Sequence, residues 1–406
     1  MRTFLAMLLG KLARRALRVV RRGGGSALPG TIARIIQPKL LEQAVSSAPL
    51  GLVVVSGSAG KSSTTKILVE LLRAHGLRVF TNPSTANIRQ GFFAAVLQFG
   101  DLRGRIDADI VVFEWDEGHG AALSKELRPR LAVITNVLSD QLDRFIDPVF
   151  VTQKITEIAN NSESILFNAG DKNLTQSLVS HGNVKTFGLS QGLLSAPEAP
   201  RYALNFGEKS VIKPDYAVMA TSDSKVNISW ASESADFKQS GDNLSQALNL
   251  TAAMGAADLL VELDISKSQS VVASMPPVFA RDELASIRGR DVRLMLVQNP
   301  TSFQLNLSQL GEHPKPLMLM AGRDIHDPSW LWTVDFSSLC RVDVVAGFNA
   351  FDLALRLKYQ GVEIGSIIPE IDVSVEAFLE LDGESPTIMF SADAMRRTRR
   401  YLGLAK

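Results

Sequence analysis

The stretch Leu52-Val-Val-Val-Ser-Gly57-Ser-Ala-Gly60-Lys61-Ser62-Ser63 decides the fold prediction for this chain of 406 residues. Residues 52–55 form a short apolar run typical of a buried strand, and residues 62–75 have the spacing of an amphipathic helix. The glycines between them allow backbone N–H groups to turn inward around a phosphate, and the helix N-terminus adds the positive end of its dipole. In such a loop the Lys61 ammonium would neutralise the β- and γ-phosphates of a nucleotide, and the Ser62 hydroxyl would bind Mg²⁺.

This loop is shorter than the usual P-loop, which has four residues between its first glycine and the Gly-Lys pair. Here only Ser58 and Ala59 separate Gly57 from Gly60. The alternative interpretation is a glycine-rich turn that simply joins a strand to a helix. Because strand, loop, Lys-Ser pair and helix follow in the required order, we predict nucleotide binding by Gly57, Ser58, Gly60, Lys61, Ser62 and Ser63.

The regions around the loop alternate between strand-like and helix-like patterns. Short apolar runs recur at residues 77–81, 110–113 and 131–135, with helical stretches between them. Such alternation predicts a parallel sheet with crossover connections. From about residue 190 to 240 the pattern instead favours antiparallel strands or an insertion, and residues 243–263 predict a helix. A second α/β domain is predicted from the apolar runs at 292–297, 316–320, 342–345 and 387–390.

Composition excludes several classes of protein. The chain carries 43 Lys and Arg against 42 Asp and Glu, and its basic residues cluster mainly near the N-terminus, so a nucleic-acid role is not supported. A single cysteine, Cys340, excludes a disulfide framework or a cysteine-cluster metal site, and its apolar surroundings predict that it is buried. No apolar run reaches the roughly 18–20 residues of a spanning helix, and basic residues follow the apolar residues 4–9, so we expect a cytoplasmic protein.

The N-terminal region is strongly basic. Nine Lys and Arg precede the first acidic residue, Glu42. Leu5, Leu8, Leu9 and Leu12 fall at helical spacing, with arginines on the opposite side. Two interpretations remain open: a helix that lies on an anionic membrane surface, and a helix docked on its own domain with a solvated basic face.

Several motifs resemble those of the Mur ligases, which join amino acids to peptidoglycan precursors through an acyl phosphate. The short loop resembles the family's Gly-Thr-x-Gly-Lys-Thr-Thr. Residues 82–91 resemble its Asn-x-x-Gly-Ala-Asn segment, and residues 113–117, Phe-Glu-Trp-Asp-Glu, resemble Glu-Val-Asp-Glu. Residues 140–144, Asp-Gln-Leu-Asp-Arg, resemble the MurT branch, the synthetase subunits of lipid II isoglutaminyl synthase, where most Mur ligases carry Asp-His-Leu-Asp.

The resemblance to the MurT branch continues along the chain, with departures. Further similar segments are residues 24–30, 279–283, 298–300, 322–324, 329–336 and 352–359. The four-cysteine zinc ribbon of that branch has no counterpart in residues 202–220, so no zinc is expected. Asn349 stands where the branch has an arginine, and Gln298 where it has a lysine. An insert at 325–328 splits the Gly-Arg-Asp segment from the Ser-Trp segment.

The resemblance implies an α/β fold: a Mur-ligase-type central P-loop ATPase domain with a parallel sheet, followed by a Rossmann-like C-terminal α/β domain. We expect a basic amphipathic helical segment at 1–48 and a central ATP-binding domain at 49–288, with an insertion region at about 190–240. The C-terminal domain would span 289–406 and contact a partner.

The resemblance also implies ATP and Mg²⁺. Ser62 and Glu114 are the candidate Mg²⁺ ligands, because hard oxygen donors suit that ion, and Glu114 also counts as a catalytic candidate. Asn87 and Asn249 are candidate nucleotide contacts. The alternatives are a solvated carboxylate at Glu114, a turn-forming residue at Asn87 and an ordinary helix residue at Asn249.

A partner is implied as well. MurT proteins act with GatD, a glutamine amidotransferase that supplies ammonia, and an aspartate of the C-terminal domain completes the partner's Cys–His pair. The matching residue here is Asp324 or, given the insert, Asp327; the alternative for each is a turn cap. Trp330 and Trp332 are predicted to be core or interface anchors.

The implied activity is ATP-dependent amidation of the D-glutamate α-carboxylate in the lipid II stem peptide, by a heterodimer with a GatD-like glutaminase. Residues 1–22 are the candidate contact with the inner face of the plasma membrane. The alternative functions are a free-standing Mur-type amino-acid ligase and a nucleotide-binding scaffold without turnover.

Overall fold

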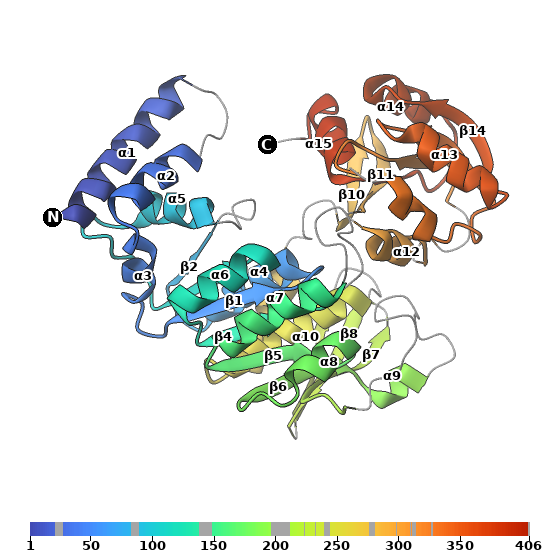
Figure 1. Cartoon of the computed structure of the whole chain (residues 1–406). Helices are drawn as coiled ribbons and strands as arrows, with labels where there is room; N and C mark the ends of the chain where they lie inside the picture. Colours follow the sequence, from blue (N-terminus) through green and yellow to red (C-terminus); the bar gives the residue numbers. More distant parts are fainter. Residues whose placement is uncertain are drawn as a thin grey trace. The chain divides into compact units, whose positions relative to one another are not determined.

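The computed structural model describes the chain except for residues 21–26, 83–88, 138–147, 196–211, 223, 232, 239–243, 276–280, 298, 309, 311–313, 326–327 and 405–406. The described residues form two compact units (Figure 1). The first unit holds residues up to 275, and the second begins at residue 281 and contains the C-terminal part of the chain.

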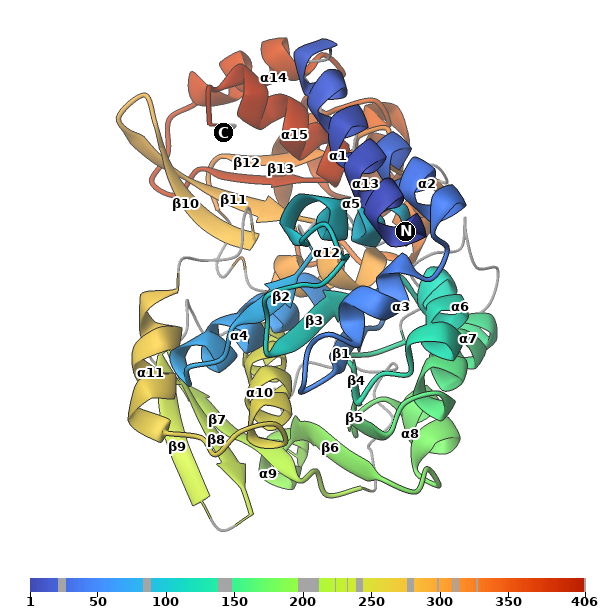
Figure 2. The same cartoon turned by 90° about the vertical axis from the view of Figure 1, so that its left-hand side faces the viewer.

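The first unit begins with a small group of helices. Helix α1 (Arg2–Val20) packs against α2 (Ala27–Ile36) and α5 (Arg89–Phe99), and the short α3 (Leu40–Val45) also contacts α5. Figures 1 and 2 both show α1, α2 and α5 side by side. No helix in the described part of the chain is both long enough and apolar enough to cross a bilayer.

The main sheet of the first unit has the strand order β2-β3-β1-β4-β5-β6-β7-β8-β9. The strands from β2 to β7 are parallel to their neighbours, whereas β7, β8 and β9 are antiparallel. Both predictions, a parallel sheet and antiparallel strands near residues 190–240, are therefore confirmed. The strands are β1 (Leu52–Ser56), β2 (Val79–Thr81), β3 (Ile110–Glu114), β4 (Leu131–Ile134), β5 (Ser164–Asn168), β6 (Val184–Leu189), β7 (Tyr216–Ser222), β8 (Lys225–Trp230) and β9 (Glu233–Lys238).

Helices cover both faces of this sheet, as Figure 2 shows. On one face α4 (Lys61–Ala74), α10 (Leu244–Asp258) and α11 (Ile265–Ser274) pack over a core that includes Val53 and Val55. On the other face lie α6 (Glu117–Leu127), α7 (Pro148–Asn160) and α8 (Lys172–Leu178); the short α9 (Gln191–Ser195) contacts β7. Strands buried on both faces explain the continuous apolar runs in the sequence.

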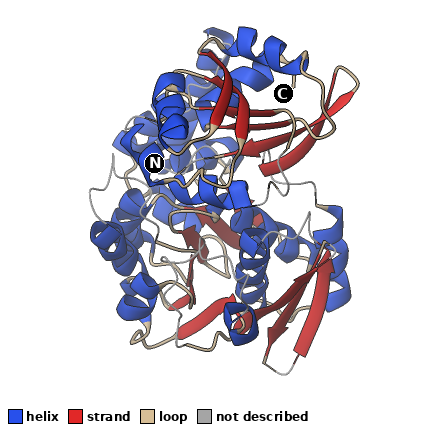
Figure 3. Cartoon of the chain, turned by 90° about the vertical axis from the view of Figure 1, so that its right-hand side faces the viewer, coloured by secondary structure: helices blue, strands red, loops and turns tan. Residues whose placement is uncertain are grey.

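The second unit is a smaller α/β layer structure with the strand order β10-β11-β15-β12-β13-β14. Strands β10 and β11 form an antiparallel pair, and the others are parallel to their neighbours. Helices lie on both faces of the sheet (Figure 3): α12, η2 and α13 on one, α14 and α15 on the other. The bounds are β10 (Arg281–Ile287), β11 (Arg290–Leu296), α12 (Pro300–Ser308), β12 (Leu317–Met320), η2 (Pro328–Thr333), β13 (Arg341–Ala346), α13 (Ala350–Tyr359), β14 (Glu363–Ile368), α14 (Ile371–Leu379), β15 (Thr387–Phe390) and α15 (Ala392–Tyr401).

The prediction of a buried Cys340 is wrong, because the side chain is exposed. Cys340 immediately precedes β13, whose apolar residues made its surroundings look like a core segment. Trp330 is partly buried against the core of the second unit, whereas Trp332 is 41% exposed. One tryptophan therefore packs against the core and the other lies at the surface.

Candidate active site

The loop between β1 and α4 has the geometry of a phosphate cradle. Gly57 has φ +125° and Gly60 has φ +85°, in a region that L side chains rarely adopt. A Cβ atom on Gly57 would lie 2.4 Å from the Thr135 hydroxyl, and one on Gly60 would lie 2.2 Å from Oδ1 of Asn249. Both positions therefore require glycine for two reasons: the backbone conformation is one that other residues rarely adopt, and there is no space for a Cβ atom.

Asn136, which follows β4, holds this loop in place. Its Oδ1 accepts a hydrogen bond from the Ala59 N–H at 2.8 Å, and its Nδ2 donates to the Ala59 carbonyl at 3.2 Å. Its backbone carbonyl also accepts from the Ser58 N–H at 2.9 Å. The Asn136 side chain therefore binds both the N–H and the carbonyl of Ala59 and clamps the loop.

Lys61, in the first turn of α4, forms an ion pair that the sequence did not predict. Its Nζ lies 2.8 Å from Oε1 of Glu117, and it also donates to the carbonyls of Gly57 and Ser58. Glu117 is 1% exposed, and its Oε2 has no hydrogen-bond partner among the described residues. A buried carboxylate oxygen without a partner is costly. Beside a phosphate cradle, such an oxygen fits a site completed by a ligand.

Glu114 and Ser62 belong to elements that adjoin the loop. Glu114 ends β3 and pairs with Val55 of β1, so it lies at the carboxyl end of the strand next to the loop. It is 5% exposed, and its backbone N–H donates to Oδ1 of Asn82 at 3.2 Å. Ser62 is partly exposed in the first turn of α4. Parallel sheets bind ligands at this edge, so both predicted Mg²⁺ ligands stand at the appropriate edge.

Asn249 reaches the loop from helix α10. Besides its closeness to Gly60, its Oδ1 accepts a hydrogen bond from the Thr64 hydroxyl at 3.4 Å. The same helix is fixed at its C-terminal end, where the Tyr216 hydroxyl donates to Oδ2 of Asp258 at 2.7 Å. Burial and this hydrogen bond raise the pKa of the Tyr216 phenol, which therefore stays neutral and keeps donating. Helix α10 is thus held at two points, Asn249 and Asp258.

The predicted site residues fall into three groups. Gly57, Ser58, Gly60, Lys61, Ser62, Ser63, Glu114 and Asn249 gather around the loop in the first unit. Asn87 and Asp327 lie outside the described residues. Asp324 belongs to the second unit.

Asp324 already serves a structural purpose. Its Oδ1 accepts from the Ser391 hydroxyl at 2.6 Å, and its Oδ2 accepts from the Ala392 N–H at 2.8 Å. A carboxylate at the N-terminus of α15 stabilises that helix. Asn349 braces the same loop, because its Nδ2 donates to the carbonyls of Gly322 at 3.0 Å and Ile325 at 2.9 Å. The asparagine that replaces an expected arginine therefore shapes the loop of Asp324.

An apolar stripe runs along the exposed side of α13. Phe351, Leu355 and Tyr359 recur every fourth residue and are 65%, 59% and 76% exposed. Trp332 packs edge to face against Tyr359, with ring centroids 5.4 Å apart. At the other end, Phe348 is 62% exposed and lies under the Arg323 guanidinium. We call these five side chains the α13 stripe.

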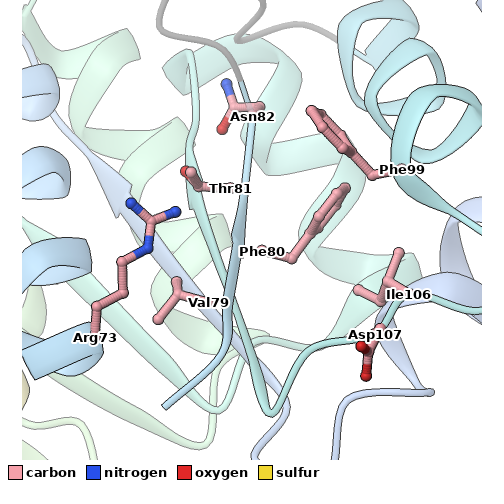
Figure 4. Close-up of a pocket in the computed structure, with 8 residues that line it drawn as sticks. All are labelled: Arg73, Val79, Phe80, Thr81, Asn82, Phe99, Ile106 and Asp107. Atoms are coloured by element: carbon pink, nitrogen blue, oxygen red, sulfur yellow. The ribbon is translucent and has the colours of Figure 1, made fainter. Parts of the chain in front are cut away.

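A cavity of about 460 Å³ lies along β2, at the edge of the main sheet. Figure 4 shows Phe80 and Phe99 facing each other on one side of the strand and Arg73 with Val79 on the other. The remaining lining residues are Thr81, Asn82, Ile106 and Asp107; none of these eight described residues belongs to the phosphate loop. Asn82 joins the cavity to the backbone of Glu114.

Within the described residues, no group of three or more His, Cys, Asp or Glu side chains is arranged to hold a metal ion. A divalent cation here would therefore need Ser62, Glu114 and oxygens from a bound phosphate together, as Mg²⁺ commonly uses one or two carboxylates plus phosphate oxygens. The donors are hard oxygens, so the residues present fit Mg²⁺ bound together with a nucleotide.

Two family models match this chain, and together they cover parts of both units. Residues 55–257, half of the chain, match the Mur ligase middle domain. The chain belongs to the Mur ligase family. Residues 296–395 match the MurT ligase C-terminal model, so both units of this Mur ligase have counterparts in the family.

Similar proteins and solved structures agree with this family assignment. The chain is 27% identical to the MurT subunit of lipid II isoglutaminyl synthase (glutamine-hydrolyzing) from Staphylococcus aureus (strain COL), over 92% of this chain and 91% of the relative. It is 26% identical to the MurT subunit from Streptococcus pneumoniae (strain ATCC BAA-255 / R6), over 87% of each. The MurF ligase from Thermotoga maritima, solved in complex with ADP, superposes with a TM-score of 0.69 at 19% identity, over 92% of this chain and 83% of that one. The predicted Mur-ligase fold and the resemblance to the MurT branch are both confirmed.

Proposed function

We propose that this Mur ligase is the ATP-consuming subunit of a glutamine-dependent synthase that amidates the D-glutamate α-carboxylate of lipid II. The observation that carries the proposal is the similarity to named MurT subunits along 92% of the chain, with matches in both units. The geometry of the phosphate loop supports the ATP-dependent half of the reaction.

The chemistry requires activation because a carboxylate is a poor electrophile. Transfer of the γ-phosphoryl group of ATP to the carboxylate makes an acyl phosphate, and ammonia then displaces inorganic phosphate to leave the amide. Such a transfer depends on positioning and on stabilising negative charge. The loop N–H groups and the Lys61 ammonium hold the phosphates, while Ser62 and Glu114 would hold Mg²⁺. That ion would supply positive charge against the transferring phosphoryl oxygens.

Lys61 must change partners during this cycle. Its ammonium is paired with Glu117, and phosphate oxygens would compete for the same donor hydrogens. Glu117 keeps the lysine inside the loop and pointing across it, which reduces the entropy lost when a nucleotide binds. Glu117 is thus a positioning residue for the phosphate clamp.

A glutaminase partner would supply the ammonia. The α13 stripe supports this part of the proposal, because contiguous exposed aromatic and aliphatic side chains mark protein interfaces. It adjoins the loop that carries Asp324, since Arg323 stacks on Phe348 of the stripe. An aspartate from this loop, Asp324 or Asp327, would orient a histidine of the partner. Because the substrate is lipid-linked, we place the enzyme on the cytoplasmic side of the plasma membrane.

Glutamine and ammonium chloride as alternative nitrogen sources test the proposal. The tagged protein is purified from its own cells with any co-purifying glutaminase, and amidation of lipid II is followed with ATP. We expect activity with either source. Asp327→Asn or Asp324→Asn should abolish the glutamine-dependent activity and spare the ammonium-dependent activity. If neither source yields an amide, the proposed function is wrong.

The α13 stripe has its own test. Phe351→Ser with Leu355→Ser should release the glutaminase during purification while ammonium-dependent amidation persists. As a matched control, Leu284→Ser with Val373→Ser removes two other exposed apolar side chains of the second unit, 68% and 54% exposed, away from the stripe. Retention of the partner by the stripe variant would exclude α13 as its docking face.

A further inference from the structure

Helix α1 is docked through Ala6, Met7 and Gly10, and its leucines face outward. Ala6, Met7 and Gly10 are buried against the unit. A Cβ on Gly10 would lie 2.5 Å from the Leu97 side chain, so the helix approaches α5 closely there. The large apolar side chains point away: Phe4, Leu5, Leu8, Leu9 and Leu12 are between 37% and 50% exposed. We call these five the α1 stripe.

Polar contacts fix this orientation. The Lys11 Nζ donates to the Gly100 carbonyl at 2.7 Å, and the Arg14 guanidinium donates to Oε1 of Gln98. The Thr3 hydroxyl donates to Oε1 of Gln43 at 3.0 Å and accepts from Nε2 of Gln37 at 2.9 Å. A helix docked on a soluble domain normally buries its apolar stripe. Here the expected solvated basic face is partly used for docking, and the apolar face remains exposed among the described residues.

Charge indicates what covers the α1 stripe. Arg2 and Arg15 are exposed. By helical spacing Arg2 lies at one margin of the stripe, and Arg15 lies beyond its C-terminal end, on the same face as Leu8 and Leu12. The first 41 residues carry nine Lys and Arg and no Asp or Glu. A helix with leucines on one face and exposed basic residues beside and beyond them suits the boundary between acyl chains and anionic headgroups.

We propose that α1 is an interfacial membrane anchor that rests the first unit on an anionic lipid surface through the α1 stripe. The helix lies along the surface, with the leucines entering the acyl boundary and the arginines meeting the headgroups. The docked side holds the helix in this orientation before any lipid is met, so little ordering is needed on binding. This anchor is independent of the nitrogen source and of the amidation step.

Sedimentation of the full-length protein with lipid vesicles tests the anchor. We expect binding to vesicles of phosphatidylglycerol and phosphatidylcholine, and much weaker binding to phosphatidylcholine alone or at high salt. Leu8→Gln with Leu12→Gln should weaken binding to the anionic vesicles by at least about tenfold. Leu284→Gln with Val373→Gln, which removes two exposed apolar side chains from the second unit, should bind like the wild type.

A second variant keeps the leucines. Arg2→Gln with Arg15→Gln should reduce the preference for anionic over neutral vesicles without changing nucleotide affinity. The proposal is overturned if the leucine variant binds anionic vesicles like the wild type, or if the wild type binds neither kind of vesicle. It is also overturned if the leucine variant merely converts a dimer to a monomer in the absence of lipid, because the stripe would then join two copies of the chain.

Discussion

The clamp formed by Asn136 predicts a specific loss of nucleotide affinity in Asn136→Ala. The substitution removes both side-chain hydrogen bonds to Ala59, at 2.8 and 3.2 Å, and leaves the backbone bond to Ser58. Each bond contributes about 0.5–1.5 kcal/mol net, so ordering the loop should cost about 1–3 kcal/mol more. Because a nucleotide binds the ordered loop, its dissociation constant should rise about 5- to 150-fold.

A matched asparagine separates this effect from general destabilisation. Asn161, at the end of α7, also makes two side-chain hydrogen bonds, from its Nδ2 to the Ser124 hydroxyl at 3.2 Å and to the Glu157 carbonyl at 2.7 Å. Asn161→Ala should lose a similar free energy of unfolding in urea, and its nucleotide dissociation constant should stay within about twofold of the wild type.

Isothermal titration calorimetry with ADP and Mg²⁺ at fixed temperature and salt measures both variants. The reasoning fails if Asn136→Ala binds ADP with wild-type affinity, because the clamp would then contribute nothing to the loop. It also fails if both variants lose affinity equally, since the loss would then follow overall stability.

Three further substitutions test other parts of the structure. Lys61→Met leaves the buried Glu117 carboxylate unpaired and should cost about 3–5 kcal/mol of unfolding free energy; adding Glu117→Gln should recover most of it without restoring turnover, and no recovery would argue against the ion pair. Gly60→Ala should lower nucleotide affinity more than tenfold through the clash with the neighbouring asparagine, whereas Gly76→Ala, at nearly the same φ of +86° but with nothing within 4 Å, should leave affinity unchanged. Asp324→Ala should cost about 2 kcal/mol in thermal unfolding as the cap of α15 is lost; an unchanged melting temperature would contradict that structural role.

Local sequence was sufficient for the central strand, the loop and the first helix of the ATPase domain. An apolar run, glycines and a Lys-Ser pair are contiguous, and their conformations depend on neighbours a few residues away. The same holds for the antiparallel strands, whose alternating pattern needs no knowledge of the rest of the chain.

The residues that contact the loop from other elements could not be predicted in this way, because their contacts depend on the arrangement of the sheet. Glu117 meets Lys61 across 56 positions of sequence, because the parallel pairing of β1 with β3 brings the starts of α4 and α6 together. Asn136 reaches the loop because β4 pairs with β1 on its other side. Polar residues within a few positions of each strand's end were the available signal, and they identify an edge of the sheet without identifying a contact.

The orientation of α1 on its domain could not be predicted from the periodicity of the sequence either. Helical spacing correctly separated the leucines from most of the arginines, but it does not specify which side faces the protein. Small residues allow the close approach: Ala6 and Gly10 are buried, and a Cβ on Gly10 would lie 2.5 Å from the Leu97 side chain of α5.

Helix α10 links the phosphate loop to strand β7, so the positions of the two are coupled. It touches the phosphate loop at Asn249 and is held by β7 through the bond between Tyr216 and Asp258. At 1.5 Å per residue these two points lie about 14 Å apart along a stiff rod, so any shift of β7 along the helix axis would move Asn249 against Gly60. A change in the segment between β6 and β7 that moved Tyr216 out of register with α10 would therefore be felt at the phosphate loop.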